Sequence, residues 1–138
     1  DNLDPTASLL DNLRCEVPPG VLLTETELRG LLGMMGLSGD KVFQDAGTLS
    51  GGEKTKLALA MMMVGRNNLL LLDEPTNNLD PPSRQAVADA LTAWPGSIIF
   101  VSHDTDFVME LAPTKVLLMP DGDVDYFNEG WLELVSLA

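Results

Sequence analysis

Apolar positions recur at helical spacing in the first part of the chain. The pattern predicts one helix over residues 6–14 and another over 24–36, with a turn at Pro18–Pro19–Gly20 between them. Thr24 and Glu27 have the spacing of a capping box, in which each side chain binds the backbone N–H of the other residue. This part of the chain is therefore expected to be mostly helical.

A third helix is expected after a looser stretch at 37–49. Ser50 and Glu53 repeat the capping-box spacing, and residues 51–67 continue as a helix whose later turns are apolar on every side. A helix that is apolar all round is buried. We therefore expect this helix to lie in the core.

From residue 69 the pattern changes to short apolar runs that alternate with helical segments. The runs lie at 69–73, 97–102 and 115–119, with helices near 82–93 and 105–112. Polar residues do not alternate with apolar ones in these runs, which is typical of strands covered on both faces. The pattern predicts an α/β fold with parallel strands and crossover helices. A turn at 120–122, a strand at 124–127 and a closing helix at 129–137 complete the prediction.

The composition is that of a globular chain with strong acidity. It has 138 residues, 45% of them hydrophobic, and 8 Lys and Arg against 21 Asp and Glu give a formal net charge of −13. This charge disfavours contact between the segment and a nucleic-acid backbone, which binds clustered cations. The longest apolar run, 57–64, is too short for a membrane span, the start does not resemble a signal peptide, and Cys15 is the single cysteine. We expect a cytoplasmic chain that does not span a membrane.

Two expected strand ends carry residues suited to catalysis. Asp73 and Glu74 directly follow the first apolar run, and His103 follows the second. Open α/β sheets bind ligands at the carboxyl ends of their strands. There, one carboxylate can hold Mg²⁺ while the other polarises an attacking water. Taken singly, the acids could instead cap the next segment, and the histidine could be a structural hydrogen-bonding residue.

The turn Ser50–Gly51–Gly52–Glu53 also fits two uses. As structure it is a capping box; as a binding element, its glycines leave backbone N–H groups open to an anion, and Ser50 adds a hydroxyl donor. The two uses are compatible. Residues 47–55 match a phosphate-binding P-loop only with a Glu inserted before the lysine, and no apolar strand precedes them, so we expect no P-loop here.

Together these segments resemble the ATP-binding cassette (ABC) ATPases, a family of P-loop NTPases. LSGGEKTKLALA (49–60) resembles the signature and its helix, and LLLLDEP (69–75) resembles Walker B with the catalytic glutamate. NNLD (77–80) resembles the D-loop, and VSHD (101–104) resembles the switch-histidine segment. DEPTNNLD and the closing GDVDYFNEGWLELV are most similar to the F subfamily, soluble proteins with two cassettes in one chain, many of which act on ribosomes. Asn78 departs from the histidine usual there.

The resemblance implies a role for each motif residue. Asp73 would serve Mg²⁺, Glu74 the hydrolytic water, and His103 the γ-phosphate of ATP. Ser50, Gly51 and Gly52, together with Glu53, would face the nucleotide of a different cassette, and Asp80 would lie at the dimer interface. Hydrolysis would then require a second cassette, in the same chain or another, which sandwiches the nucleotides head to tail.

The resemblance also implies that residues 1–138 form only part of a nucleotide-binding domain. Residues 1–50 would be its mostly helical subdomain up to the signature, and 51–138 the second half of its α/β core. The P-loop (Walker A) and the Q-loop, which precede the signature in this family, do not occur here. The strand that leads into the P-loop is expected between the runs at 97–102 and 115–119. We therefore expect the isolated chain to be inactive, and to be unstable, swapped or completed by another polypeptide.

Three functions remain open at this point. The first is ATP binding and hydrolysis within a soluble F-subfamily ATPase that acts in translation, with ribosome contacts made by other regions. The second is the nucleotide-binding subunit of a membrane transporter. The third is a non-catalytic regulatory or interaction module that supplies a signature face to the nucleotide of another cassette.

Overall fold

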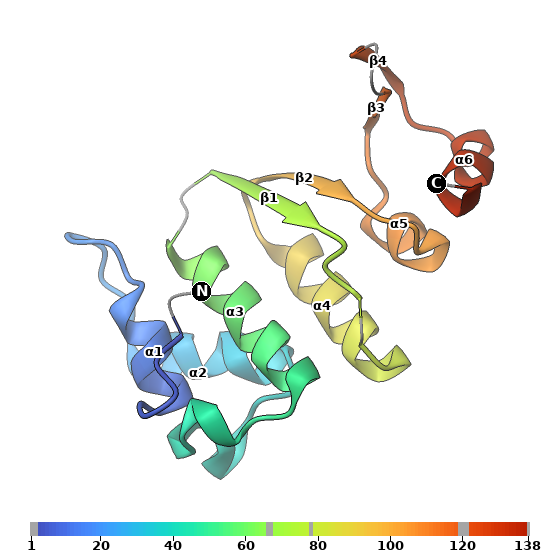
Figure 1. The fold of residues 1–138 in the computed structure, drawn as a ribbon. Helices are drawn as coiled ribbons and strands as arrows, with labels where there is room; N and C mark the ends of the chain where they lie inside the picture. The colour runs from blue at the N-terminus through green and yellow to red at the C-terminus, as the bar shows by residue number, and fades with distance from the viewer. Residues whose placement is uncertain (1–2, 66–67, 78, 119–121, 138) are drawn as a thin grey trace.

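The fold consists of a helical layer followed by strands with crossover helices. The computed structural model describes residues 3–65, 68–77, 79–118 and 122–137. Some residues named in the sequence analysis lie outside the described residues: 66–67 at the end of the third predicted helix, Asn78, Met119 at the end of the third apolar run, and Pro120 and Asp121 of the predicted turn. The helical layer comprises α1 (Leu9–Cys15), α2 (Glu25–Met34), the 3-10 helices η1 (Gly39–Phe43) and η2 (Ala46–Thr48), and α3 (Gly51–Gly65) (Figure 1). It is followed by β1 (Leu69–Asp73), α4 (Pro81–Ala93), β2 (Ser97–Val101), α5 (Thr105–Leu111), β3 (Lys115–Leu118), β4 (Asp123–Tyr126), η3 (Glu129–Trp131) and α6 (Leu132–Leu137).

Side-chain caps set the starts of the first two α-helices. The Thr24 hydroxyl accepts the backbone N–H of Glu27 at 3.1 Å, which confirms the capping residue predicted for α2. α1 begins later than predicted, because Ser8 is its N-cap and accepts the N–H of Asp11 at 3.0 Å. Thr6 is excluded from the helix, since both its N–H and its hydroxyl bind the Asp4 carboxylate.

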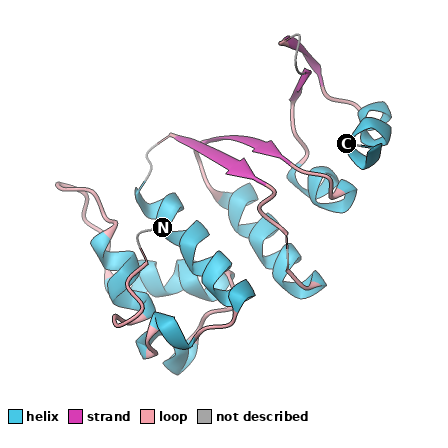
Figure 2. Cartoon of the chain, in the orientation of Figure 1, coloured by secondary structure: helices cyan, strands magenta, loops and turns pink. Residues whose placement is uncertain are grey.

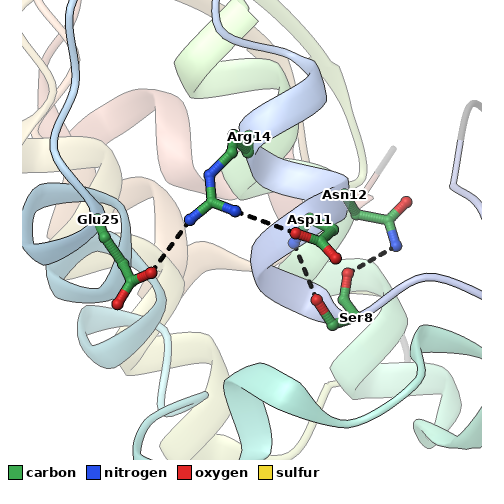
Figure 3. A network of polar contacts seen from close by, with 5 residues as sticks. All are labelled: Ser8, Asp11, Asn12, Arg14 and Glu25. Atoms are coloured by element: carbon green, nitrogen blue, oxygen red, sulfur yellow. Dashed lines mark hydrogen bonds and ion pairs between the residues drawn. The ribbon is translucent and has the colours of Figure 1, made fainter.

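Polar side chains of α1 contact neighbouring parts of the helical layer. Arg14 binds Asp11 at 3.1 Å and Glu25 at 3.2 Å, and so joins α1 to the first turn of α2 (Figure 3). The buried amide of Asn12 donates to the carbonyl oxygens of Asp4 and Ser8 and accepts the N–H of Asp4 at 2.8 Å. Because the buried amide is satisfied on both its nitrogen and its oxygen, its burial costs little stability.

α3 lies in the core, as its apolar sequence predicts. Leu57 and Ala60 have no exposed surface, and Leu59, Met61 and Met63 are also buried. Buried side chains of α1, α2 and α4 complete the same cluster: Leu9, Leu13, Leu28, Leu32, Val87 and Leu91. The helix that begins at the Ser50 turn is therefore fixed by packing from Lys56 to Met63, although Met62 in this stretch is partly exposed.

β1 and β2 form a parallel pair, and α4 is the crossover between them. Leu69 lies opposite Ser97 and Asp73 opposite Val101. The two strands lie on the same side of α3 and α4 (Figure 2). The parallel pairing places the ends of both strands, and the residues that follow them, at the same edge of the sheet.

The pair is covered on one face only, and the prediction of two covered faces is wrong for the described residues. Leu70 and Leu72 are buried on the helix side, whereas Leu71, Ile99 and Val101 are more than half exposed on the other side. The reason is that the described helices that pack on the strands lie on one side of the pair. The continuous apolar run thus leaves an apolar outer face on the sheet.

The third apolar run does not join this pair. β3 pairs antiparallel with β4, with Lys115 opposite Tyr126, in a separate two-stranded sheet. The antiparallel partner just along the chain satisfies one edge of β3. No described strand pairs with its other edge, where the strand leading into the P-loop is expected, so the parallel arrangement predicted for this run stays a prediction. The predicted strand near 124–127 is confirmed with a shift of one residue, and the closing helix is divided between η3 and α6.

Candidate functional site

The Ser50 turn forms the predicted capping box at the start of α3. The backbone N–H of Ser50 donates to Glu53 Oε1 at 3.1 Å, and the N–H of Glu53 donates to the Ser50 hydroxyl at 3.2 Å. A Cβ placed on Gly51 would meet no atom within 4 Å, so the turn faces open space. Its geometry therefore leaves room for a ligand or a partner surface.

A third residue, Lys41 of η1, also binds this turn. Its ammonium forms an ion pair with Glu53 Oε2, the carboxylate oxygen that does not bind Ser50. The Lys41 contact, followed by the Ser50 N–H, lowers the pKa of the Glu53 carboxyl. This pair was not predicted, because Lys41 and Glu53 lie on two different helices, and the periods used to analyse a sequence apply within one element.

Asp73 and Glu74 lie at the carboxyl end of β1, where the fold predicts them, but in different settings. Asp73 is exposed, and its carboxylate makes no hydrogen bond or ion pair with another residue that the structure describes. Glu74 has a φ of 48°, in the left-handed region that is unfavourable for a residue with a side chain. Its N–H donates to the carbonyl of Val101 at 2.8 Å, which ties the end of β1 to the end of β2.

The structure brings Glu74 and His103 together from the two strand ends. Glu74 Oε2 accepts the backbone N–H of His103 at 3.3 Å, and Glu74 Oε1 lies against His103 Nδ1 as an ion-pair contact. This oxygen is buried and accepts no aligned hydrogen bond from the described residues. The imidazole is about half exposed, so it can reach both the glutamate and a ligand.

Asp104, the next residue, anchors the second strand end. Its carboxylate accepts the N–H of Phe107 at 3.2 Å, the guanidinium of Arg84 at 3.0 Å and the hydroxyl of Thr76 at 3.3 Å. Burial alone would raise the pKa of Asp104, but these contacts outweigh it and lower the pKa. The sequence signal for this residue was its position as N-cap of α5; its contacts with Arg84 and Thr76 depend on the fold.

Asp80 stands apart from the strand-end residues. It is the N-cap position of α4 and is exposed, and the Ser83 side chain, with a smaller effect of the Lys56 charge, lowers its pKa. In the structure as described, no hydrogen bond or ion pair joins Asp80 or the Ser50 turn to Asp73, Glu74 or His103. The candidate residues thus form a strand-end group and two separate surface positions.

Comparison with known proteins assigns these motifs to a family. The sequence profile described as "ABC transporter" matches residues 1–77, more than half of the chain. The chain belongs to the ABC transporter family. This family contains ATP-binding cassettes, and the likeness extends from the first residues through the Ser50 turn to the end of the Walker B segment.

Relatives and solved structures agree with this assignment. The chain is 42% identical to the ATP-binding protein YdiF of Bacillus subtilis over 98% of its length, and 52% identical to YheS of Haemophilus influenzae over 76%. It is 40% identical over 75% of its length to "ABC transporter F family member 5" of Arabidopsis thaliana. It spans only 22%, 16% and 16% of these three relatives.

The fold is that of an ABC cassette. The dimeric bacterial ABC transporter cassette MJ0796 superimposes with a TM-score of 0.72 at 20% identity, over 91% of this chain and 59% of that one. A post-hydrolysis dimer of MJ0796 with ADP and Pi gives a TM-score of 0.69 at 21% identity, over the same shares of the two chains. Within the described residues, no helix combines the length and apolar character needed to cross a membrane.

Proposed function

We propose that this chain supplies the signature turn and the strand-end catalytic group for ATP hydrolysis by a pair of ABC cassettes. The observation that supports this most directly is the meeting of Glu74 and His103 from two separate strands. A carboxylate and an imidazole in contact at the ligand-binding edge of a parallel sheet can orient water and stabilise charge in phosphoryl transfer.

In this proposal Glu74 polarises the attacking water. Its backbone is held by Val101 and its carboxylate by the N–H and ring of His103, so its position is fixed before a substrate arrives. A fixed, charged acceptor costs little reorganisation when the reaction occurs. The second ring nitrogen of His103, Nε2, binds no other described residue and is open to an oxygen of the γ-phosphate.

Asp73 is the residue proposed to serve Mg²⁺. Its exposed carboxylate has no partner among the described residues, and Mg²⁺ is commonly held by one or two carboxylates together with substrate phosphates and water. The donor set therefore fits this ion. When bound with ATP, Mg²⁺ would neutralise phosphate charge next to Glu74.

The Ser50 turn and Asp80 are proposed to act on the other side of the cassette. Ser50, Gly51 and Gly52 would offer a hydroxyl and backbone N–H groups to the nucleotide of a second cassette, with Glu53 as the cap that shapes the turn. Asp80 would lie at the interface between the two cassettes. Among the described residues, no hydrogen bond or ion pair joins these positions to the strand-end group, which is compatible with contributions to two different sites.

We also propose that residues 1–138 act as part of one cassette, with 1–50 as the helical subdomain and 51–138 as the second half of the α/β core. Two features support this: the outer face of the β1–β2 pair is bare and apolar, and the chain matches 59% of the MJ0796 cassette. A strand from outside this segment would extend the sheet beside β2, and the elements that accompany it and the P-loop would cover that face. The segment alone would then bind no ATP at a site of its own.

The likeness to F-family relatives favours a cytoplasmic protein that acts in translation. The support is the DEPTNNLD motif and the 40% identity to an F family member. In this setting the ribosome would be bound by other regions of the protein, since the charge of −13 is unsuited to RNA contact. The two alternative functions are that of a transporter subunit and that of a non-catalytic module.

The decisive experiment compares ATP turnover of the full-length protein with that of Glu74→Gln. We expect turnover to fall by about 100-fold or more, because a neutral amide cannot polarise water as a carboxylate does, while ATP binding persists. Glu110→Gln, on the exposed side of α5, is the matched control and should keep wild-type turnover.

Each alternative predicts a different result. Equal turnover in the wild type and Glu74→Gln would refute the role of Glu74, and no turnover in either would favour a non-catalytic module. Cosedimentation of ATP-loaded Glu74→Gln with ribosomes would support the translation setting. Copurification with a membrane permease instead would favour the transporter role.

A further inference from the structure

Among the described residues outside 49–60, Lys41 is the one that binds the signature turn through a side-chain contact. It lies on η1, a segment held firmly by the helical layer. The neighbouring Val42 is completely buried, and the N–H of Leu9 donates to the carbonyl of Gln44 at 3.2 Å. The base of Lys41 is therefore fixed, and its ion pair with Glu53 ties the turn to a rigid part of the protein.

Glu53 has two opposing effects on a phosphate at this turn. Its carboxylate caps the Ser50 N–H and favours the start of α3, because an acid in the first turn of a helix interacts well with the helix dipole. The same negative charge repels an incoming phosphate oxygen. The lowered pKa of Glu53 keeps the carboxyl ionised at neutral pH, so the repulsion is present under working conditions.

Lys41 can remove this conflict. Its ammonium binds Oε2 while Oε1 remains on the Ser50 N–H, so both carboxylate oxygens are engaged at once. The pair is partly shielded, with 33% of the Lys41 side chain and 26% of the Glu53 side chain exposed. Partial shielding strengthens the interaction relative to an ion pair in open solvent.

We propose that Lys41 is a positioning residue for the signature turn, which orients Glu53 against Ser50 and neutralises its charge towards the phosphate of the opposing cassette. This inference rests on the proposed function, because it assigns the turn a nucleotide as its ligand. It assigns Lys41 no contact with the nucleotide itself.

The test is a double-mutant cycle of Lys41→Met and Glu53→Gln in the full-length protein. Methionine keeps the apolar stem of Lys41, and glutamine keeps an acceptor for the Ser50 N–H but carries no charge. We expect Lys41→Met to raise the ATP concentration at half-maximal turnover roughly two- to five-fold, the size expected for one partly exposed charge at a helix N-terminus. The same change made in the Glu53→Gln protein should have no further effect on that concentration.

Controls separate this role from general stability. Lys41→Arg should restore the wild-type value, and Arg14→Met, which removes a cation from a different ion pair of the helical layer, should not change it. The proposal would be overturned if Lys41→Met raised the ATP concentration at half-maximal turnover equally in the wild type and in the Glu53→Gln protein, since charge neutralisation requires the Glu53 carboxylate.

Hydrogen exchange of the peptide that contains Ser50 and the first turn of α3 gives an independent readout. We expect faster exchange in Lys41→Met than in the wild type, with no ATP present. Unchanged exchange would refute the positioning role even if the protein hydrolyses ATP. If the wild type lacks ATP turnover, the proposed function fails, and the exchange result still decides whether Lys41 holds the turn.

Discussion

The helical layer and the strand region use similar apolar sequences in opposite ways. In the helical layer, up to the end of α3, Leu9, Leu13 and Leu32 have no exposed surface. In the strand region, Leu71 and Ile99 lie on a bare face of the sheet. The first region has a buried apolar core, although Leu22 and Phe43 on its surface are exposed, whereas the second region holds its polar strand ends in place and has exposed apolar residues on the outer face of its sheet.

This contrast matches the division of chemistry between the regions. The Ser50 turn belongs to the helical layer, and its shape is set by the capping box of Ser50 with Glu53 and by Lys41. Glu74 and His103 belong to the region whose outer face is bare, and polar contacts between strand ends hold them. We infer that the surface turn is formed within this segment, whereas the strand-end site is completed by contacts from outside it.

A matched pair of leucine substitutions tests the contrast most strongly. Leu32→Ala removes a fully buried side chain of the helical core and should lower the free energy of unfolding by about 2–5 kcal/mol. Leu71→Ala, at a position that is 64% exposed, should lower it by no more than about 0.5 kcal/mol. Chemical denaturation measures both on the monomer of the 138-residue chain, which size-exclusion chromatography separates from swapped or associated species. A large cost for Leu71→Ala would mean that the outer face is covered in solution.

Sequence reasoning succeeded where local signals were strong. The caps at Thr24 and Ser50, the buried α3 and the strands that end in Asp73 and Val101 all depend on spacing within a few residues. The meeting of the two strand ends followed from parallel pairing, although the direct contact of Glu74 with His103 was not foreseen. Local spacing therefore identified the candidate residues but not how they touch.

The features that sequence reasoning missed depend on tertiary contacts. The ion pair of Lys41 with Glu53 and the anchoring of Asp104 by Arg84 join residues that are 12 and 20 positions apart. Such pairs have no period to reveal them. The antiparallel direction of the pairing between β3 and β4 was not predicted, because an apolar run carries no information on whether its neighbour is parallel or antiparallel. Only the packed structure decides these pairings.

Removing the charge of Asp104, in the strand region, is expected to change the free energy of unfolding by an amount between those for Leu32→Ala and Leu71→Ala. Its carboxylate binds three donors, so Asp104→Asn should lower the free energy of unfolding by about 1–3 kcal/mol near neutral pH. The folded-state pKa lies below its ordinary value of 3.8, so the stabilisation is present above that value and is lost as the pH falls through the folded-state pKa.

The pH dependence gives the measurement. Acid unfolding followed by circular dichroism should show a wild-type advantage over Asp104→Asn at pH 7 that shrinks below pH 4. Asp106→Asn, an exposed acid in the same helix turn, is the control and should change stability less. An advantage that is constant down to pH 2 would contradict the view that the ionised carboxylate holds this strand end.

The smallest effect is expected where the helical layer relies on exposed charge. Arg14 pairs with Asp11 within α1 and joins α1 to α2 through Glu25, but about half of each of these side chains is exposed (Figure 3). Solvent and salt screen such pairs, so Arg14→Ala should cost about 0.2–1 kcal/mol, and less at high salt, as measured by denaturation at two ionic strengths. A salt-independent cost above about 2 kcal/mol would mean that the layer depends on this polar bridge rather than on its apolar core. Because Leu9 and Leu13 bury the inner face of the same helix, we expect the core to dominate.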